Sequence, residues 1–213
     1  MKNIIIYAMD TMADWEYAYL TTEVVGAESV HPGRFRVLFA GATATPVRTL
    51  GGLSITPETT VAEVDLDSAA ALVLPGGQTW GEGHDEVLSL AKRAVEAGVP
   101  LGAICGATFG IARAGLLDAI PHTSNDPSFL EQSGYSGSSL YEFREAVTAG
   151  GVTTASGLRP VPFTAEILVA AGVLPAGYAN AWRELNASPT LANYEEYVRQ
   201  SKAFAAATRR GHP

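Results

Sequence analysis

Short apolar runs alternate with segments of helical periodicity along almost the whole chain. The apolar runs are rich in β-branched residues and show no polar face, which is typical of strands buried on both sides in a parallel sheet. They predict main strands over residues 3–9, 34–40, 70–74 and 99–104. Two further pairs of short segments flank Gly-Gly steps and predict hairpins, at 46–48 with 53–56 and at 146–148 with 152–155.

Apolar residues spaced three and four apart predict helices between these strands. The predicted helices cover 14–26, 82–97, 108–117, 127–134, 163–171 and 176–186, and a last one begins at 188–189 and runs towards 209. Gly26 is the expected stop of the first helix, and Asp126 followed by Pro127 is a typical helix start. Strands and helices in alternation predict an α/β fold, a doubly wound sandwich with a mostly parallel sheet and helices on both faces. We expect one domain over 1–213, with a helical extension from about residue 176.

Composition narrows the class of protein. The 213 residues are 47% hydrophobic and 17% charged, which excludes a disordered chain and allows a full core without a metal or disulfide. A net charge of −8 argues against nucleic-acid binding. No apolar run approaches the roughly 20 residues of a membrane span, and residues 1–3 lead into a strand rather than a signal peptide. With a single cysteine, the sequence predicts a cytoplasmic protein.

That cysteine, Cys105, directly follows the predicted strand 99–104 and directly precedes a helix. Its neighbours are small: Gly102, Ala103, Gly106 and Ala107. A sharp strand-to-helix turn with small flanking residues is the layout of a nucleophile elbow, here with cysteine in place of serine. The helix N-terminus would favour the thiolate and lower the pKa of the thiol. The alternative is an inert buried cysteine, a common position for this residue.

Two other strand ends carry residues that could act with the thiol. Pro75-Gly76-Gly77 follows the strand 70–74, and an N–H from this turn, together with that of Gly106, could form an oxyanion hole. A plain tight turn would have the same sequence. Glu16 lies on the opening turn of the first helix, where it is either a surface charge that complements the helix dipole or a carboxyl held beside Cys105.

A nucleophilic cysteine commonly has a base beside it, and the chain has four histidines. His31 and His212 lie in a surface-type loop and in the terminal tail, which makes them poor candidates. His84 lies in the loop 78–85, where the alternative is that it only begins the predicted helix. His122 follows the helix 108–117, where the chain should return to the sheet, and among the four we favour it as the partner of Cys105. The alternative is a structural hydrogen-bonding histidine, which is the commoner role of a lone histidine.

Together these segments resemble the ThiJ/PfpI family of the class I glutamine amidotransferase-like superfamily, over roughly residues 3–175. The matching motifs, in order, are Ala13-Asp14-Trp15-Glu16, Leu74-Pro75-Gly76-Gly77, Ala103-Ile104-Cys105-Gly106-Ala107, His122-Thr123-Ser124-Asn125 and Thr154-Ala155-Ser156-Gly157. The resemblance implies a flavodoxin-like fold and, in most members, a homodimer. It further implies Cys105 as the reactive residue, Glu16 as its hydrogen-bond partner, His122 as its histidine, and Gly77 and Gly106 as oxyanion donors.

The departures from the family pattern matter for function. In the family's proteases a histidine directly follows the cysteine, but Gly106 stands there, which weakens a peptidase interpretation. The late His-x-Glu pair of true amidotransferases is absent from the sequence, so ammonia transfer from glutamine is not expected.

The sequence therefore predicts a cofactor-independent, metal-free cysteine enzyme of hydrolase or hydratase type, acting on a small carbonyl or amide compound. The resemblance suggests hydration of a 2-oxoaldehyde of the methylglyoxal type, as in glyoxalase III-like members; hydrolysis of a nitrile, isocyanide or amide is the alternative. A different class of function is a stress sensor or protective protein whose cysteine is oxidised to the sulfinic acid without turnover. A plain ligand-binding module is disfavoured, because the first strand-to-helix turn has no glycine-rich phosphate loop.

Overall fold

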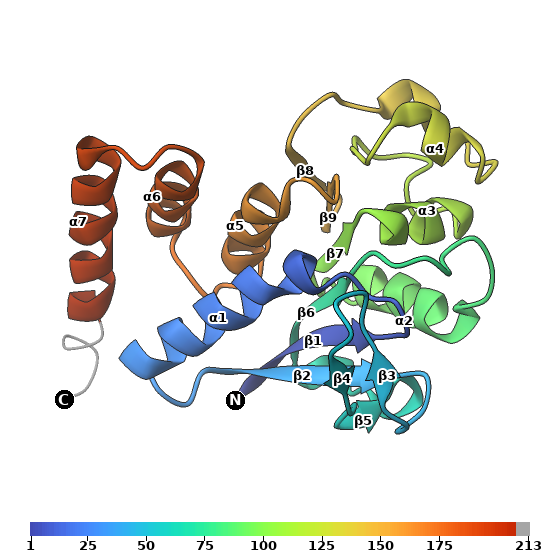
Figure 1. The fold of residues 1–213 in the computed structure, drawn as a ribbon, viewed down its shortest axis with the longest axis horizontal. Coiled ribbons are helices and arrows are strands. Elements are labelled where there is room, and N and C mark those ends of the chain that lie inside the picture. Colours follow the sequence, from blue (N-terminus) through green and yellow to red (C-terminus); the bar gives the residue numbers. More distant parts are fainter. Residues whose placement is uncertain (208–213) are drawn as a thin grey trace.

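A computed structural model of the chain describes residues 1–207. Its centre is a seven-stranded sheet with the order β5-β2-β1-β6-β7-β9-β8 (Figure 1). The strands are β1 (Lys2–Ala8), β2 (Phe35–Gly41), β5 (Thr59–Thr60), β6 (Ala69–Leu74), β7 (Leu101–Ile104), β8 (Ala146–Ala149) and β9 (Val152–Ala155). All neighbouring strands are parallel except β8 and β9.

The order of the strands reverses beside β1. From β1 the chain first moves outward to β2 and then returns to β6 on the opposite side, from which it continues to β7 and β9. Ligand sites of doubly wound sheets lie at the carboxyl ends of the strands near such a reversal. Ile4, Ile5 and Ile6 of β1 are fully buried, as expected for the central strand of a sheet covered on both faces.

Helices cover both faces of this sheet (Figure 1). They are α1 (Asp14–Val30), α2 (Asp85–Glu96), α3 (Gly106–Arg113), α4 (Pro127–Glu131), α5 (Pro160–Ala170), α6 (Ala176–Ala187) and α7 (Leu191–Ala207). The helices α1 and α5 pack together on one face, and α2 and α3 pack on the other. Beyond α5, α6 packs on α5 and α7 packs on α6, so the last two helices extend away from the sheet.

The predicted architecture is confirmed: the protein has a flavodoxin-like α/β fold with a mostly parallel sheet. The predicted hairpins are present as β3 (Val47–Arg48) with β4 (Ser54–Ile55), in a small sheet of their own, and as β8 with β9. The short edge strand β5 was not predicted, because two threonines carry no periodicity. The predicted start of the last helix at 188–189 falls three residues or fewer before Leu191, and its predicted end near 209 lies outside the described residues.

The predicted stop of the first helix at Gly26 is wrong. The helix α1 continues to Val30, because Ala27 still packs into the core and Gly26 meets no neighbouring atom that would interrupt the helix. The residue after Val30, His31, is the C-cap of the helix. Pro32 follows it and disfavours a helical conformation of His31. No helix among residues 1–207 has the length and apolar character needed to cross a membrane.

Candidate active site at the carboxyl end of the sheet

Cys105 occupies the turn between β7 and α3 and has a backbone that few side chains adopt. Its φ is 58° and its ψ is −124°, and it is the N-cap residue of α3, which begins at Gly106 rather than at the predicted Thr108. The Thr108 amide N–H and the Thr108 hydroxyl both donate to the Cys105 carbonyl, at 3.1 and 2.5 Å. These bonds help to hold a positive φ at a residue with a side chain, a kind of strain that gathers at functional sites.

Two glycines clamp the sulfur and the Glu16 carboxyl from opposite sides. A Cβ on Gly76 would lie 2.6 Å from Cys105 Cβ and 2.7 Å from Glu16 Oε2. A Cβ on Gly157 would lie 2.8 Å from both Cys105 Sγ and Glu16 Oε1. Neither position accepts a side chain without displacing the pair. Residues from β6, β7, β9 and α1 therefore converge on one point at the carboxyl end of the sheet.

Glu16 is a buried carboxyl rather than a surface charge. It lies on the first turn of α1, has no exposed surface, and its Oε2 accepts the Gly76 N–H at 2.5 Å. Burial raises the pKa of Glu16 to about 7, against the opposing effects of the Gly76 N–H and the Cys105 thiol. A carboxyl with a pKa of about 7 can accept and return a proton at neutral pH.

The sequence-based expectation that the thiol pKa is lowered is not met. Burial of the half-buried Cys105 raises the pKa of its thiol, and the charge of Glu16 raises it further. Hydrogen bonds from Asn125 and from the Gly106 N–H favour the thiolate, but they do not reverse the direction. The resting thiol therefore keeps its proton beside a carboxyl that can take it.

The backbones of Gly77 and Gly106 lie close to each other. A Cβ on Gly106 would lie 2.7 Å from the Gly77 carbonyl oxygen and 3.3 Å from the Gly77 nitrogen. The Gly106 N–H is directed at Cys105 Sγ. The two residues predicted as oxyanion donors are thus adjacent to each other.

His122 does not reach the thiol. Its side chain is completely buried, with Nδ1 2.8 Å from the Ile120 carbonyl oxygen and Nε2 3.0 Å from the Tyr135 hydroxyl. Both ring nitrogens are therefore engaged in a structural contact. The prediction that His122 partners Cys105 is corrected, because the side chain that contacts the sulfur comes from the residue three positions further along the chain.

That side chain is Asn125, which the sequence reasoning quoted within a motif but did not select. Its Nδ2 donates to Cys105 Sγ at 3.3 Å, while its Oδ1 accepts the Gly157 N–H at 2.9 Å and the Ser156 hydroxyl at 3.2 Å. A backbone N–H can only donate, so the contact with Gly157 fixes which end of the amide faces the sulfur. Asn125 therefore donates to the sulfur and cannot act as a base.

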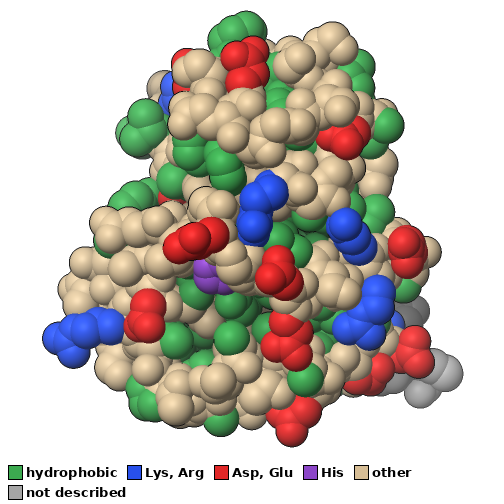
Figure 2. All heavy atoms as spheres, turned by 90° about the vertical axis from the view of Figure 1, so that its right-hand side faces the viewer, with side chains coloured by type: hydrophobic (Ala, Val, Ile, Leu, Met, Phe, Trp, Pro, Cys, Tyr) green, Lys and Arg blue, Asp and Glu red, His purple; other side chains and the backbone are tan. Residues whose placement is uncertain are grey.

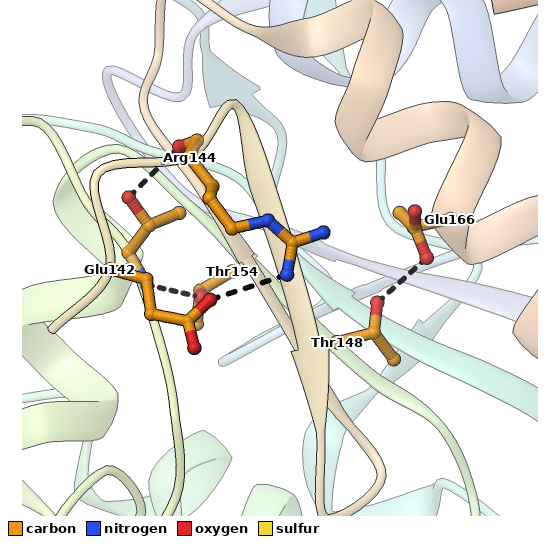
Figure 3. Close-up of polar contacts among 6 residues, drawn as sticks. Glu142, Arg144, Thr148, Thr154 and Glu166 are labelled. Atoms are coloured by element: carbon orange, nitrogen blue, oxygen red, sulfur yellow. Dashed lines mark hydrogen bonds and ion pairs between the residues drawn. The ribbon is translucent and has the colours of Figure 1, made fainter. Parts of the chain in front are cut away.

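The segment that carries Asn125 is tied to the sheet by Thr123. The Thr123 N–H donates to Thr154 Oγ1 of β9 at 2.9 Å, and the Thr123 hydroxyl donates to the Arg144 carbonyl at 3.1 Å (Figure 3). Arg144 in turn forms an ion pair with Glu142 at 3.2 Å, which also appears in Figure 3. These contacts fix the segment in the position from which Asn125 reaches Cys105 and Gly157.

The other histidines lie elsewhere. His31 Nε2 is 2.8 Å from the Phe204 carbonyl of α7, and His212 lies outside the described residues. His84 is the N-cap residue of α2, with φ 60°, and both its ring nitrogens contact hydroxyls: Nδ1 that of Tyr7 at 3.0 Å, and Nε2 that of Thr79 at 2.9 Å.

Comparison with known proteins supports the family resemblance seen in the sequence. A sequence model of the DJ-1/PfpI family matches residues 2–171, which leaves α6 and α7 outside the match. The chain is 36% identical over 190 residues to a protein of Bacillus subtilis (strain 168) named "Uncharacterized protease YoaZ", covering 87% of this chain and 90% of that protein.

Solved structures agree. The crystal structure of a thiJ/pfpI family protein from Bacillus anthracis superimposes with a TM-score of 0.86 at 32% identity, covering 93% of this chain and 96% of the other. The DJ-1 superfamily protein Atu0886 from Agrobacterium tumefaciens superimposes with a TM-score of 0.77 at 30% identity, covering 89% and 100%. The family match over most of the chain and the similarity of the fold lead to one conclusion: the chain belongs to the DJ-1/PfpI family.

Proposed function

We propose that the protein is a cysteine-dependent, cofactor-independent enzyme in which Cys105 attacks the electrophilic carbon of a small carbonyl or amide compound. The observation that carries this proposal is the Cys105–Glu16 pair. A protonated thiol lies beside a buried carboxyl whose pKa is about 7, and the Gly106 N–H, next to Gly77, is directed at the sulfur. Nucleophile, proton acceptor and oxyanion donors are thereby within reach of one substrate carbon.

The proton on the thiol goes to Glu16. As sulfur forms its bond to the carbonyl carbon, the ionised carboxyl removes the thiol proton, and the carbonyl π electrons move to oxygen. The N–H groups of Gly77 and Gly106 would hold that oxyanion. Asn125 Nδ2 donates to the sulfur throughout and stabilises the negative charge that passes through it.

The second half of the reaction uses the same groups. With an ester or amide, the oxyanion collapses, the bond to the leaving group breaks, and Glu16 returns the proton to the departing oxygen or nitrogen. Water then attacks the thioester, Glu16 accepts a proton from that water, and the released thiolate regains the proton. The sum is hydrolysis of the substrate, with the enzyme unchanged. With an aldehyde, protonation of the oxyanion gives a thiohemiacetal.

The surroundings of the sulfur support a small substrate. Gly76 and Gly157 close two sides, and the thiol itself is only half exposed. Trp15 donates its indole N–H to the Gly157 carbonyl at 2.9 Å and is 48% exposed, and the neighbouring Leu158 is 84% exposed. One exposed apolar side chain is thus bonded to Gly157 and the other is its neighbour in the chain, and apolar surroundings suit a short acyl group.

The protease name of the Bacillus subtilis relative does not by itself extend to this chain. A peptide amine is a poor leaving group and is commonly released with the help of an imidazolium ion. Here the imidazoles of His122 and His84 are engaged elsewhere, and the side chain on the thiol is the amide of Asn125. The arrangement favours more activated carbonyl compounds over peptides.

The test is turnover of p-nitrophenyl acetate and of a panel of small 2-oxoaldehydes and amides by the wild type, Cys105→Ala and Cys105→Ser. We expect turnover by the wild type, an acetyl adduct on Cys105 visible by mass spectrometry, and a loss of at least about 10³-fold in Cys105→Ala. Retention of wild-type turnover by both variants would refute the proposal.

The same samples distinguish the sensor function. A thiol whose pKa is raised reacts slowly with peroxide, because the thiolate is the species that is oxidised. We therefore expect the wild type to resist mild peroxide in the absence of substrate. Rapid, selective conversion of Cys105 to the sulfinic acid, combined with no turnover of any compound, would favour the sensor instead.

We also propose that the protein forms a homodimer, as its family resemblance implies. Phe143, which is 87% exposed, is a large apolar side chain of the kind that an interface covers. Light scattering coupled to size-exclusion chromatography tests this directly, and a monomeric mass at micromolar concentration would contradict it.

A further inference from the structure

Trp80 is a large, fully buried side chain in the loop after β6. Its indole N–H donates to the Pro75 carbonyl at 2.9 Å, which closes the loop that contains Gly76 and Gly77 onto itself. The same loop is tied to Glu16 through the Gly76 N–H and to the Thr11 hydroxyl through the Gln78 N–H, at 2.5 and 3.0 Å. The hydrogen bonds to Glu16 and Thr11 therefore fix the loop relative to α1. The bond from Trp80 to Pro75 holds the two ends of the loop together.

The other side of the indole lies on the first two turns of α3. A Cβ on Gly106 would lie 3.0 Å from Trp80 Cδ1, and a Cβ on Gly110 would lie 2.9 Å from Trp80 Cζ3. The ring therefore rests against the backbone of α3 at two positions one turn apart, where side chains are absent. Trp80 therefore fills the space between the loop that contains Gly77 and the start of α3.

Two further aromatic rings pack against the Trp80 indole. The Trp80 ring lies 4.6 Å from the His84 ring and 5.9 Å from the Tyr7 ring, measured between centroids. His84 is fixed by the Tyr7 and Thr79 hydroxyls on its two nitrogens. Tyr7, Thr79 and His84 also line a cavity of about 510 Å³ on the side of the molecule that Figure 2 shows, where acidic side chains lie beside a histidine.

We propose that Trp80 is a positioning residue that sets the spacing between the Gly77 and Gly106 N–H groups and thereby the strength of the oxyanion hole. This inference rests on the proposed function. The two backbones touch each other, and the ring contacts one of them directly while it closes the loop of the other. A change of a few tenths of an ångström at the ring is therefore transmitted to both donors, and donors of this kind act only at short, aligned distances.

Two reactions of the same sulfur separate this role from a general structural one. Attack on p-nitrophenyl acetate creates an oxyanion and needs both N–H groups. Alkylation by iodoacetamide displaces iodide at a saturated carbon and creates no oxyanion, so its rate reports the thiol and the groups that set its pKa, without any need for a pair of oxyanion donors. The ratio of the two rates therefore measures the oxyanion hole.

The experiment compares Trp80→Phe with Trp182→Phe as a matched control. Trp182 is also buried, but it lies on α6 against Tyr19, away from the loop. We expect Trp80→Phe to lower kcat for the ester by about tenfold or more, with KM and the alkylation rate changed by less than about threefold, and Trp182→Phe to leave the ratio at the wild-type value. Gly110→Ala pushes a methyl group into the indole from the other side, so it should lower the same ratio even if Trp80→Phe fails to fold.

The inference is overturned if both rates fall together in folded Trp80→Phe and Gly110→Ala, or if neither falls. The Cys105→Ala variant distinguishes failure of the proposed function from failure of the inference about Trp80. If that variant retains ester turnover, the proposed function fails and the inference fails with it. If it is inactive while the Trp80 and Gly110 variants keep the wild-type ratio, only the role of Trp80 is refuted.

Discussion

Asn125 donates its side-chain N–H to the Cys105 sulfur over 3.3 Å while its carbonyl accepts the Gly157 N–H at 2.9 Å. An amide in this place can stabilise negative charge on sulfur, but it can neither remove nor return a proton at neutral pH. In the proposed mechanism, proton transfer at the thiol is therefore assigned to Glu16, whose buried carboxyl lies beside it. Several measurable consequences result from this division between a donor and an acid–base group.

Asn125→Asp should make the thiol less reactive. The aspartate can still accept the Gly157 N–H, but it replaces a donor at the sulfur by a second carboxylate beside Glu16. Like charges nearby raise the pKa of a thiol, so we expect alkylation of Cys105 by iodoacetamide at pH 7 to slow by about tenfold or more. Asn180→Asp, at an exposed position on α6, is the control. An unchanged rate in Asn125→Asp would show that the contact at 3.3 Å does not influence the thiol.

The pH dependence of turnover should follow Glu16. The carboxyl accepts the thiol proton only when it is ionised, so kcat/KM should rise with pH through about 7, the pKa to which burial raises this group. Glu16→Gln keeps an acceptor for the Gly76 N–H but cannot take a proton, and it should lower turnover by about 10²–10⁴-fold and remove this limb of the profile. A profile that keeps its rise near pH 7 in the variant would assign the titration to another group.

Glu16→Gln should also change how stability depends on pH. In the folded protein the pKa is about 7, above the 4.5 of an ordinary glutamate, so the folded state holds a proton that the unfolded chain releases. The free energy of unfolding of the wild type therefore falls by on the order of 3 kcal/mol through this group as the pH rises from 4.5 to about 7. The Glu16→Gln variant has no such group to titrate and keeps this part of its stability. Urea unfolding at pH 4.5, 6 and 8 should show that the free energy of unfolding of the variant increases relative to that of the wild type at each step. Parallel stabilities across the three pH values would contradict the raised pKa.

Gly157→Ala should disable the site more than it harms the fold. Its new methyl group would lie 2.8 Å from both the sulfur and Glu16 Oε1, so the pair must separate. We expect a loss of about 1–3 kcal/mol in the free energy of unfolding and a loss of turnover of at least about 100-fold. Gly81→Ala is the matched control, since a Cβ there meets nothing within 4 Å, and it should leave both quantities near the wild-type values.

Much of this arrangement could be predicted because it is encoded locally. A buried apolar run followed at once by Cys105, small residues and a helix predicts the elbow without knowledge of any other segment. The same holds for Gly77, directly after β6, and for Glu16, on the first turn after β1. Since parallel strands end at one edge of a sheet, the order of the elements is enough to bring these residues together.

The rest depends on contacts that no local pattern contains. The choice between His122 and Asn125 is decided by the Thr123–Thr154 contact, which sets how far the returning segment runs along β9 before it faces the sulfur. The direction of the thiol pKa was missed for a similar reason. The helix N-terminus is visible in the sequence, whereas the burial that outweighs it comes from residues of distant segments such as Gly157.

The clamp of Gly76 and Gly157 has a consequence for chemical labelling of this protein. With a backbone wall on either side, a group attached to sulfur has room to grow only away from Gly76 and Gly157. Slender reagents should therefore modify Cys105 faster than bulky maleimides of equal intrinsic reactivity. A covalent probe for Cys105 should therefore be narrow at the first two atoms from its reactive group, with its affinity handle at the far end of a thin linker.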